Sequence, residues 1–514
     1  METMIDKKAN QEFDIHWLPL TLDGKYLQDV AKLAEAYGVS AVHLSHRLVH
    51  HADEVRHDEE RLERVRDAVR MFRASGLDVW CWTHEVSKPP EVCIGRDGRL
   101  QLEHPALWAY LEQKYEEVLV ELLPGLRGLV LTFAETQFEV YKEHKVSSLY
   151  TGEDAREYKT GKLVDALNGI CRKHGVRLAI RDFVYRQPEI DSMLKAIAAA
   201  DDEVEVMSKC VPHDWQPYYP DNPVIGRTGR KRQWVEFDLG HEYEMQTALP
   251  FAEPDLLWRR IRDARTAGVE TFCLRLDRYD GNVGSSAIYK PWGRLELLVF
   301  SQCAARPGIS WREIVAEWEA TQFPGAGEVV MLATEVIRRM LFPQKLWLAN
   351  HSNLPSFNYA QDHLKGGNAD RLPIWTGSAV DALAETFCDR PNRQWYDFLC
   401  AETEKNAVLL QRIDAIMKVR PAACQASDEQ AWQDGISALH AWEELFRLYQ
   451  QAYFGIRLLE NEPGAITVSA ITEAIDRLEE ACGRFRENHP DFMLTGAPAW
   501  EMHGLVIRSL RDRL

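Results

Sequence analysis

The feature that most constrains the fold of this chain is a series of eight short apolar runs separated by longer stretches of helical spacing. Eight strand-then-helix units are typical of a (β/α)8 barrel. A doubly wound sheet is the alternative, but it usually carries a glycine-rich first turn, whereas LTLDGKYLQD (20–29) holds a single glycine. We therefore predict a barrel with strands in residues 13–20, 41–46, 77–82, 126–133, 176–184, 204–209, 233–239 and 271–276.

Helical spacing of apolar residues predicts where the helices lie. Several of the helical stretches between the strands end in glycine, as a helix C-cap requires. After residue 290 only helical spacing recurs, so we predict a catalytic barrel in residues 1–290 and an all-α domain in residues 291–514. The clearest helical stretches are 26–38, 60–76, 105–123 and 254–268 in the barrel, then 311–323, 329–342, 393–419, 429–460 and 470–489.

Composition excludes several classes of function. The net charge is −18, so binding to nucleic-acid phosphates is not expected. The chain has no run of about 18 apolar residues, so no membrane span is predicted. The N-terminal METMIDKKANQEFD lacks the apolar stretch of a signal peptide. The ten cysteines form no CxxC pair, which argues against a zinc ribbon or a disulfide framework. A cytoplasmic location is the expectation.

Charged residues stand at the ends of several predicted strands. In such barrels the chemistry takes place at the C-terminal ends of the strands, so these side chains are predicted to converge on one mouth. Glycoside hydrolysis needs two carboxyl groups there, one protonated and one ionised, and Arg or Lys beside them suits an anionic substrate. In strand order these residues are His84 and Glu85, Glu135, Arg181 and Asp182, Lys209 and Asp214, His241 and Glu242, and Arg275 and Asp277.

Other interpretations of these residues stay open at this point. A single Glu at a strand end is more often a solvated loop residue or an ion-pair partner. His213 and His241, with Asp214 and Glu242, could hold a metal, but their spacing is not compact, so we predict no metal. The chain has no nucleophile elbow, Walker loop or Rossmann fingerprint. Agreement across several strands is what favours a glycosidase.

Five segments resemble glycoside hydrolase family 67, the α-glucuronidases that release glucuronic acid or its 4-O-methyl ether from xylan-derived oligosaccharides with inversion. That family usually carries an extra α/β domain before its barrel. Here the first strand begins near residue 13, so the chain resembles a divergent member without that domain. The segments are LEHPALWAYLEQKYEEVLVELLPGLRGLVLTFAETQ (102–137), RDFVY (181–185), SKCVPHDWQPYYPDNPVIG (208–226), EFDLGHEYE (236–244) and PWGRLELLVFSQCAARPGISWREIVAEWEATQF (291–323), the last at the join to the helical domain.

The resemblance implies a role for each candidate residue. Glu135 would be the catalytic acid, and Asp214 and Glu242 the candidate bases that activate water. No metal or cofactor is implied. The substrate-binding residues would be Arg181 and Lys209 at the uronate, Trp215 in the pocket wall, and His241 and Arg275 beside them.

The leading hypothesis is therefore an inverting glycosidase that removes an α-linked uronic acid from an oligosaccharide, as in xylan breakdown. A barrel glycosidase for another sugar is one alternative. A carbohydrate-binding barrel that lost catalysis is another, although a binder would not need all three carboxylates. A homodimer through the helical domain is a further expectation.

Overall fold

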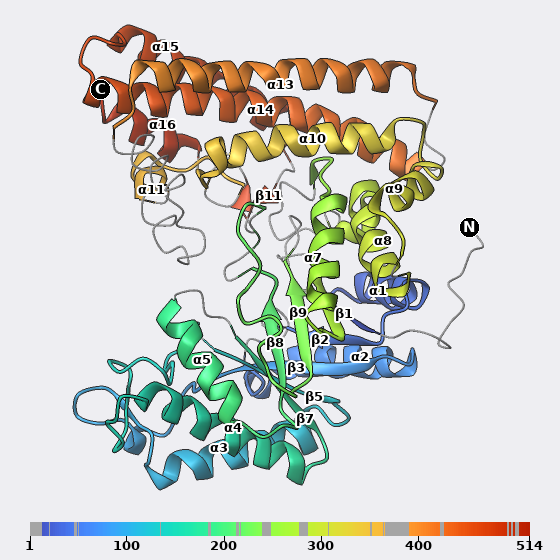
Figure 1. Cartoon of the computed structure of the whole chain (residues 1–514), viewed down its shortest axis with the longest axis vertical. Coiled ribbons are helices and arrows are strands. Elements are labelled where there is room, and N and C mark those ends of the chain that lie inside the picture. Colours follow the sequence, from blue (N-terminus) through green and yellow to red (C-terminus); the bar gives the residue numbers. More distant parts are fainter. Residues whose placement is uncertain are drawn as a thin grey trace. The chain divides into compact units, whose positions relative to one another are not determined.

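The structure is a computed structural model (Figure 1). It describes residues 13–19, 21–45, 49, 51–133, 135–182, 187–211, 215, 217–238, 248–276, 286–306, 308–349, 352–362, 364, 390–421, 426–490, 493–494, 497–498 and 503–514.

The described residues divide into two compact units. The first unit takes residues within 1–239, 258–283 and 300–309, and the second takes residues within 240–257, 284–299 and 310–514. The domain boundary predicted at residue 290 stays a prediction.

A closed barrel of eight parallel strands forms the centre of the first unit. Each predicted apolar run overlaps one strand, and the strands follow one another around the barrel in chain order, so the barrel prediction is confirmed. The strands are β1 (Asp14–Leu18), β2 (Ala41–Leu44), β3 (Asp78–His84), β5 (Gly128–Thr132), β7 (Arg177–Arg181), β8 (Glu205–Lys209), β9 (Gln233–Phe237) and β10 (Thr271–Arg275).

Helices follow most of these strands, and local sequence signals set their ends. The Asp23 carboxylate accepts from the Tyr26 N–H at 2.7 Å and caps the first helix. Gly38 and Gly76 take the left-handed backbone that ends the first two helices before β2 and β3. Figure 1 shows the helices around the strands: α1 (Gly24–Ala36), α2 (Glu59–Ala74), α3 (Pro105–Glu117) with a π turn (Val118–Leu122), α4 (Ala155–Lys173), α5 (Gln187–Ala199) and α7 (Pro254–Thr266).

A small parallel sheet, which the sequence did not predict, ties together the loops after β3 and β5. It pairs β4 (Leu100–Gln101) with β6 (Val146–Ser147). The Leu100 N–H donates to the Lys145 carbonyl at 2.9 Å. Two-residue strands carry no periodicity, so no pattern could indicate them.

Large aromatic side chains fill the barrel interior. Trp80, Trp82 and Trp234 are buried and belong to one apolar cluster with small residues from other strands. Because side chains alternate between the two faces of a strand, the residues two positions further along, such as Glu236 after Trp234, also point inward. The interior is therefore a packed core with charged groups above it.

The described residues of the second unit are mostly helical, as the sequence predicted, and they include one two-stranded ribbon. Within it α10, α13 and α14 run side by side (Figure 1). No described helix is both long enough and apolar enough to cross a membrane. From residue 291 the elements are α8 (Pro291–Ala305), α9 (Trp311–Glu319), α10 (Ala326–Leu341), α11 (Phe357–Asp362), α13 (Arg393–Val419), α14 (Ala426–Asn461), α15 (Val468–Asn488), β11 (Met493–Leu494), β12 (Ala497–Pro498) and α16 (His503–Arg511).

Candidate functional site

A buried charged layer lies at the C-terminal ends of β7 to β10. Arg181 donates from Nε and Nη2 to the two oxygens of Glu236, the second bond being 3.0 Å long. Arg275 Nη2 donates to the same carboxylate at 2.9 Å. Arg275 Nε lies 3.0 Å from Asp238 Oδ1, and Lys209 Nζ pairs with the other oxygen of Asp238. These five side chains, which we call the charged layer, are each no more than 4% exposed.

The charged layer rests on the aromatic core. The Arg181 guanidinium lies over the ring of Trp82, with Cζ 4.7 Å from the ring centroid. A cation over an indole face is attracted by the ring quadrupole. Arg181 Nη1 also donates to Thr132 Oγ1 at 3.4 Å. The guanidinium therefore stacks on the Trp82 ring and donates at its edge to Thr132 and Glu236.

The protonation states of the carboxyl groups set the charge of the described part of this layer. Burial opposes ionisation of Glu236, but the charges of Arg181 and Arg275 outweigh it and hold the pKa of Glu236 well below its usual range. Asp182 adds no full negative charge at neutral pH, because burial raises the pKa of its carboxyl to about 8. Among the residues that the structure describes, the layer thus contains three cationic side chains and two carboxylates. Buried cationic side chains favour an anionic group near them.

Asp182 takes part in a second set of contacts, which links β7 to the segment after β8. The Lys209 N–H donates to Asp182 Oδ1 at 3.3 Å, and the Ser208 hydroxyl also bonds to this carboxyl. Ser208 Oγ accepts from Gln233 Nε2 at 2.9 Å. Gln233 Oε1 in turn accepts from the Gly226 N–H at 2.7 Å. These bonds anchor the far end of the 208–226 segment.

Trp215 belongs to this segment and is buried, at 2% exposed. The Asn222 N–H donates to the Cys210 carbonyl at 2.9 Å, which closes the segment into a loop. Arg260 of α7 donates to the Tyr219 carbonyl at 2.9 Å and fixes the loop from outside. These two bonds hold the described residues of the loop, 217–222, in place.

Glu135 follows β5 and is exposed. Its φ of 56° places it in the left-handed region, which is uncommon for a residue other than glycine. The next residues are fixed to the loop after β3: Thr136 Oγ1 donates to the Val86 carbonyl at 3.3 Å, and the Phe138 N–H donates to the same carbonyl at 3.2 Å. Strained backbone of this kind clusters at functional sites.

The structure thus brings Arg181, Lys209 and Arg275 together in one layer, whereas Glu135 stands after the neighbouring strand β5. Asp214, His241 and Glu242 lie outside the described residues, as do His213 and Asp277.

Sequence reasoning missed Glu236 and Asp238 as members of the site. Both stand inside the run QWVEFDL (233–239), which was treated as a plain apolar strand. The missed signal was alternation, since Trp234, Glu236 and Asp238 occupy every second position and share the inward face.

One buried cluster, formed by His16, His43 and Cys273, has the residue types of a metal site. Their ligand atoms lie within 4.8 Å of one another. The Trp82 indole N–H, however, donates to His43 Nδ1 at 3.1 Å, so the ring proton of neutral His43 must be on Nε2. A His that binds a metal through one nitrogen donates an N–H from the other, and an indole cannot accept it. The described contacts therefore fit a hydrogen-bond chain better than a metal.

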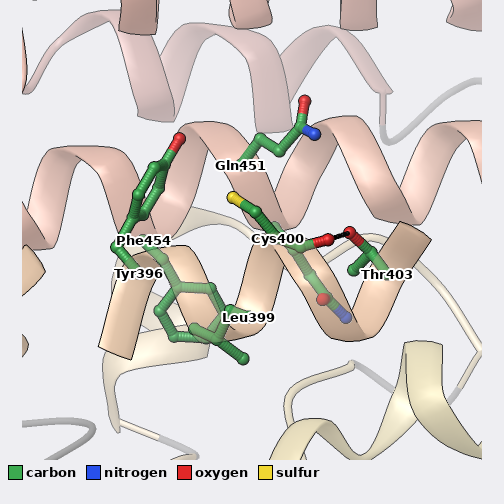
Figure 2. Close-up of a pocket in the computed structure, with 7 residues that line it drawn as sticks. Tyr396, Leu399, Cys400, Thr403, Gln451 and Phe454 are labelled. Carbon is green, nitrogen blue, oxygen red and sulfur yellow. Dashed lines mark hydrogen bonds between the residues drawn. The ribbon is translucent and has the colours of Figure 1, made fainter. Parts of the chain in front are cut away.

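A small pocket in the helical unit lies between α13 and α14 (Figure 2). It has about 180 Å³ of space, including its mouth. Thr403 Oγ1 donates to the Cys400 carbonyl at 2.8 Å, and Gln450 Nε2 donates to the Met340 carbonyl at 2.9 Å. Because these polar groups already have protein partners, they do not indicate a ligand in the pocket. It is lined by Tyr396, Leu399, Cys400, Thr403, Gln450, Gln451 and Phe454.

The chain matches no family model and no curated protein in sequence. Its fold resembles that of a GH138 enzyme targeting pectin rhamnogalacturonan II, with a TM-score of 0.58 and 11% identity. That match covers 96% of this chain and 64% of the enzyme, so the chain spans less than two thirds of its length.

Two further structures resemble the chain more weakly. One is CpGH84B, with a TM-score of 0.46, 11% identity, and coverage of 97% of this chain and 77% of that one. The other is a mutant O-GlcNAc hydrolase of Thermobaculum terrenum, with a TM-score of 0.43, 12% identity, and coverage of 98% and 96%. At 11% identity the match to the GH138 enzyme bears on the fold alone.

Proposed function

We propose that this chain is a glycoside hydrolase that removes an α-linked uronic acid, glucuronic acid or its 4-O-methyl ether, from an oligosaccharide. The observation that carries the proposal is the grouping of three buried cationic side chains, Arg181, Lys209 and Arg275, at the C-terminal ends of the strands. A uronate differs from a neutral sugar by one negative charge, and cationic side chains suit such a group. The fold neighbour that targets pectin rhamnogalacturonan II is itself a carbohydrate-active enzyme, which supports the reaction class by analogy.

The proposed roles follow the order of the strands. Glu135 donates a proton to the leaving oxygen from the loop after β5. Asp214 and Glu242, which follow β8 and β9, activate water on the opposite face of the sugar. An inverting site needs about 6.5–9.5 Å between acid and base so that the water fits between them. Placing the bases two and three strands away from the acid around the barrel is compatible with that gap.

Uronate recognition is assigned to Lys209, Arg181 and Arg275, with His241 and Trp215 completing the pocket. Lys209 is the best residue for a test, because Asp238 keeps Arg275 as a partner when Lys209 is removed. Arg181 would be a poorer choice, since its loss also removes the contact with Trp82.

The experiment measures binding of glucuronic acid and of glucose to Lys209→Met and to the unaltered protein by calorimetry. Losing a buried charged partner costs roughly 2–5 kcal/mol, so affinity for glucuronic acid should fall by at least about 30-fold. Affinity for glucose should stay within about threefold. Equal losses for the two sugars would favour a barrel glycosidase for a neutral sugar. Glucuronic acid binding without turnover of any uronoside would favour a non-catalytic binding protein.

A further inference from the structure

A directed hydrogen-bond chain runs through the barrel core beneath the charged layer. It starts at the Trp82 indole, which can only donate, and reaches His43 Nδ1 at 3.1 Å. Since His43 then carries its proton on Nε2, that nitrogen donates to His16 Nδ1, 3.0 Å away. The direction of both bonds is fixed by the indole at one end. His16 must therefore carry its own proton on Nε2.

Both imidazoles are neutral in the folded chain. Burial lowers the pKa of His16 to about 3, helped by the charges of Arg232 and Arg177. Burial, with a smaller contribution from His16, lowers the pKa of His43 well below its usual value. Each neutral imidazole has one donor and one acceptor nitrogen, as the hydrogen-bond chain from Trp82 to His16 requires.

The hydrogen-bond chain is linked to the charged layer through the indole ring of Trp82. Trp82 has the indole N–H that His43 accepts, and its face carries the Arg181 guanidinium at 4.7 Å. If the indole turned about its side-chain bonds, the guanidinium would lose its support. Arg181 would then hold Glu236 less firmly, and the carboxylate that Arg275 shares would shift as well.

We propose that His43 and His16 are positioning residues, which fix the Trp82 indole as the platform beneath Arg181 and so hold the charged layer in place. Neither imidazole needs to touch the substrate. This proposal deepens the proposed function, because the layer it supports is the one assigned to the uronate.

The test uses His43→Leu, which removes both ring nitrogens, and His43→Gln, which keeps an acceptor and a donor. Protein labelled with 15N in tryptophan and arginine reports the Trp82 indole N–H, assigned by its loss in Trp82→Phe, and the Arg181 Nε–H, assigned by its loss in Arg181→Lys. A matched control is Trp80→Phe, an inward-facing tryptophan of the same strand with a ring of the same size. Thermal unfolding of each variant reports general damage.

In His43→Leu, hydrogen exchange at the Trp82 indole and at Arg181 Nε is expected to quicken at least tenfold. His43→Gln should restore both rates to within about threefold, and Trp80→Phe should leave Arg181 Nε unchanged. In turnover of a glucuronosyl xylo-oligosaccharide, kcat/KM should fall at least tenfold for His43→Leu and recover in His43→Gln.

Unchanged exchange at Arg181 Nε in His43→Leu overturns the proposal, and so does equal damage in His43→Gln. Exchange does not depend on the reaction. If exchange responds as expected but no uronoside is hydrolysed by the unaltered protein, the positioning role stands and the proposed function is wrong.

Discussion

At the scale of single residues, Glu135 combines an exposed carboxylate with a strained backbone. A left-handed φ costs a residue with a side chain roughly 1 kcal/mol relative to glycine, and the φ of Glu135 is 56°. We predict that Glu135→Gly raises the free energy of unfolding by about 1 kcal/mol while abolishing uronoside turnover. Urea unfolding and an activity assay check the two effects.

Glu135→Gln is the matched control, since it keeps the side chain and the strain. It should lose turnover without gaining stability. A stabilised glycine variant that stays fully active would mean that Glu135 has no role in the reaction.

Asp182 gives a prediction for stability against pH. Burial raises its pKa in the folded chain to about 8, against a usual value of 3.8. Between these values the folded chain keeps a proton that the unfolded chain has released, so the stability contribution of this group falls as pH rises from 3.8 to about 8. One pKa unit corresponds to about 1.4 kcal/mol, so the loss amounts to several kcal/mol.

Asp182→Asn removes this ionisation and keeps the shape of the side chain. The unaltered protein should therefore lose more unfolding free energy than Asp182→Asn as pH rises from about 4.5 to about 8.5. Urea titrations at the two pH values measure it. Parallel pH profiles for the two proteins would contradict the burial of an ionisable carboxyl.

At the scale of elements, the charged layer joins β7, β8, β9 and β10 through two carboxylates. Removing one member of a buried ion pair costs about 3–5 kcal/mol, because the remaining charge is left uncompensated. Glu236→Gln should therefore destabilise the chain by about that much, since Arg181 and Arg275 both lose a charge partner. Urea unfolding measures the loss.

Glu328→Gln is the control for that variant, because Glu328 pairs with Arg412 at 2.8 Å on an exposed surface. A surface pair contributes about 0–1 kcal/mol. Equal losses for Glu236→Gln and Glu328→Gln would show that the charged layer does not stabilise the barrel.

The elements themselves were predictable where a pattern repeats. Each barrel strand overlaps an apolar run, and helices such as α13 extend over ranges that their spacing indicated. The β4–β6 pair was not predictable, because two residues show no period. Glu236 and Asp238 were not among the predicted site residues, because they stand inside a predicted strand and only the alternation of its side chains places them inward.

At the scale of the whole molecule, the order of strands around the barrel followed from the sequence, because each strand-then-helix unit packs beside the one before it. The substrate cannot be predicted from the order of the strands. Recognition depends on how side chains from distant strands share charge, and Arg181 and Glu236 are 55 residues apart. A linear pattern shows that both are present but cannot show that they are partners.

Proton NMR of the first sugar released from a glucuronosyl xylo-oligosaccharide tests the proposed inverting reaction. We predict that the β-anomer of glucuronic acid forms first, since water attacks the face opposite the leaving group. Glu135→Gln should not release glucuronic acid at a rate comparable to that of the unaltered protein. First release of the α-anomer would mean that a carboxylate attacks the sugar directly, and release of no uronic acid at all would contradict the proposed function itself.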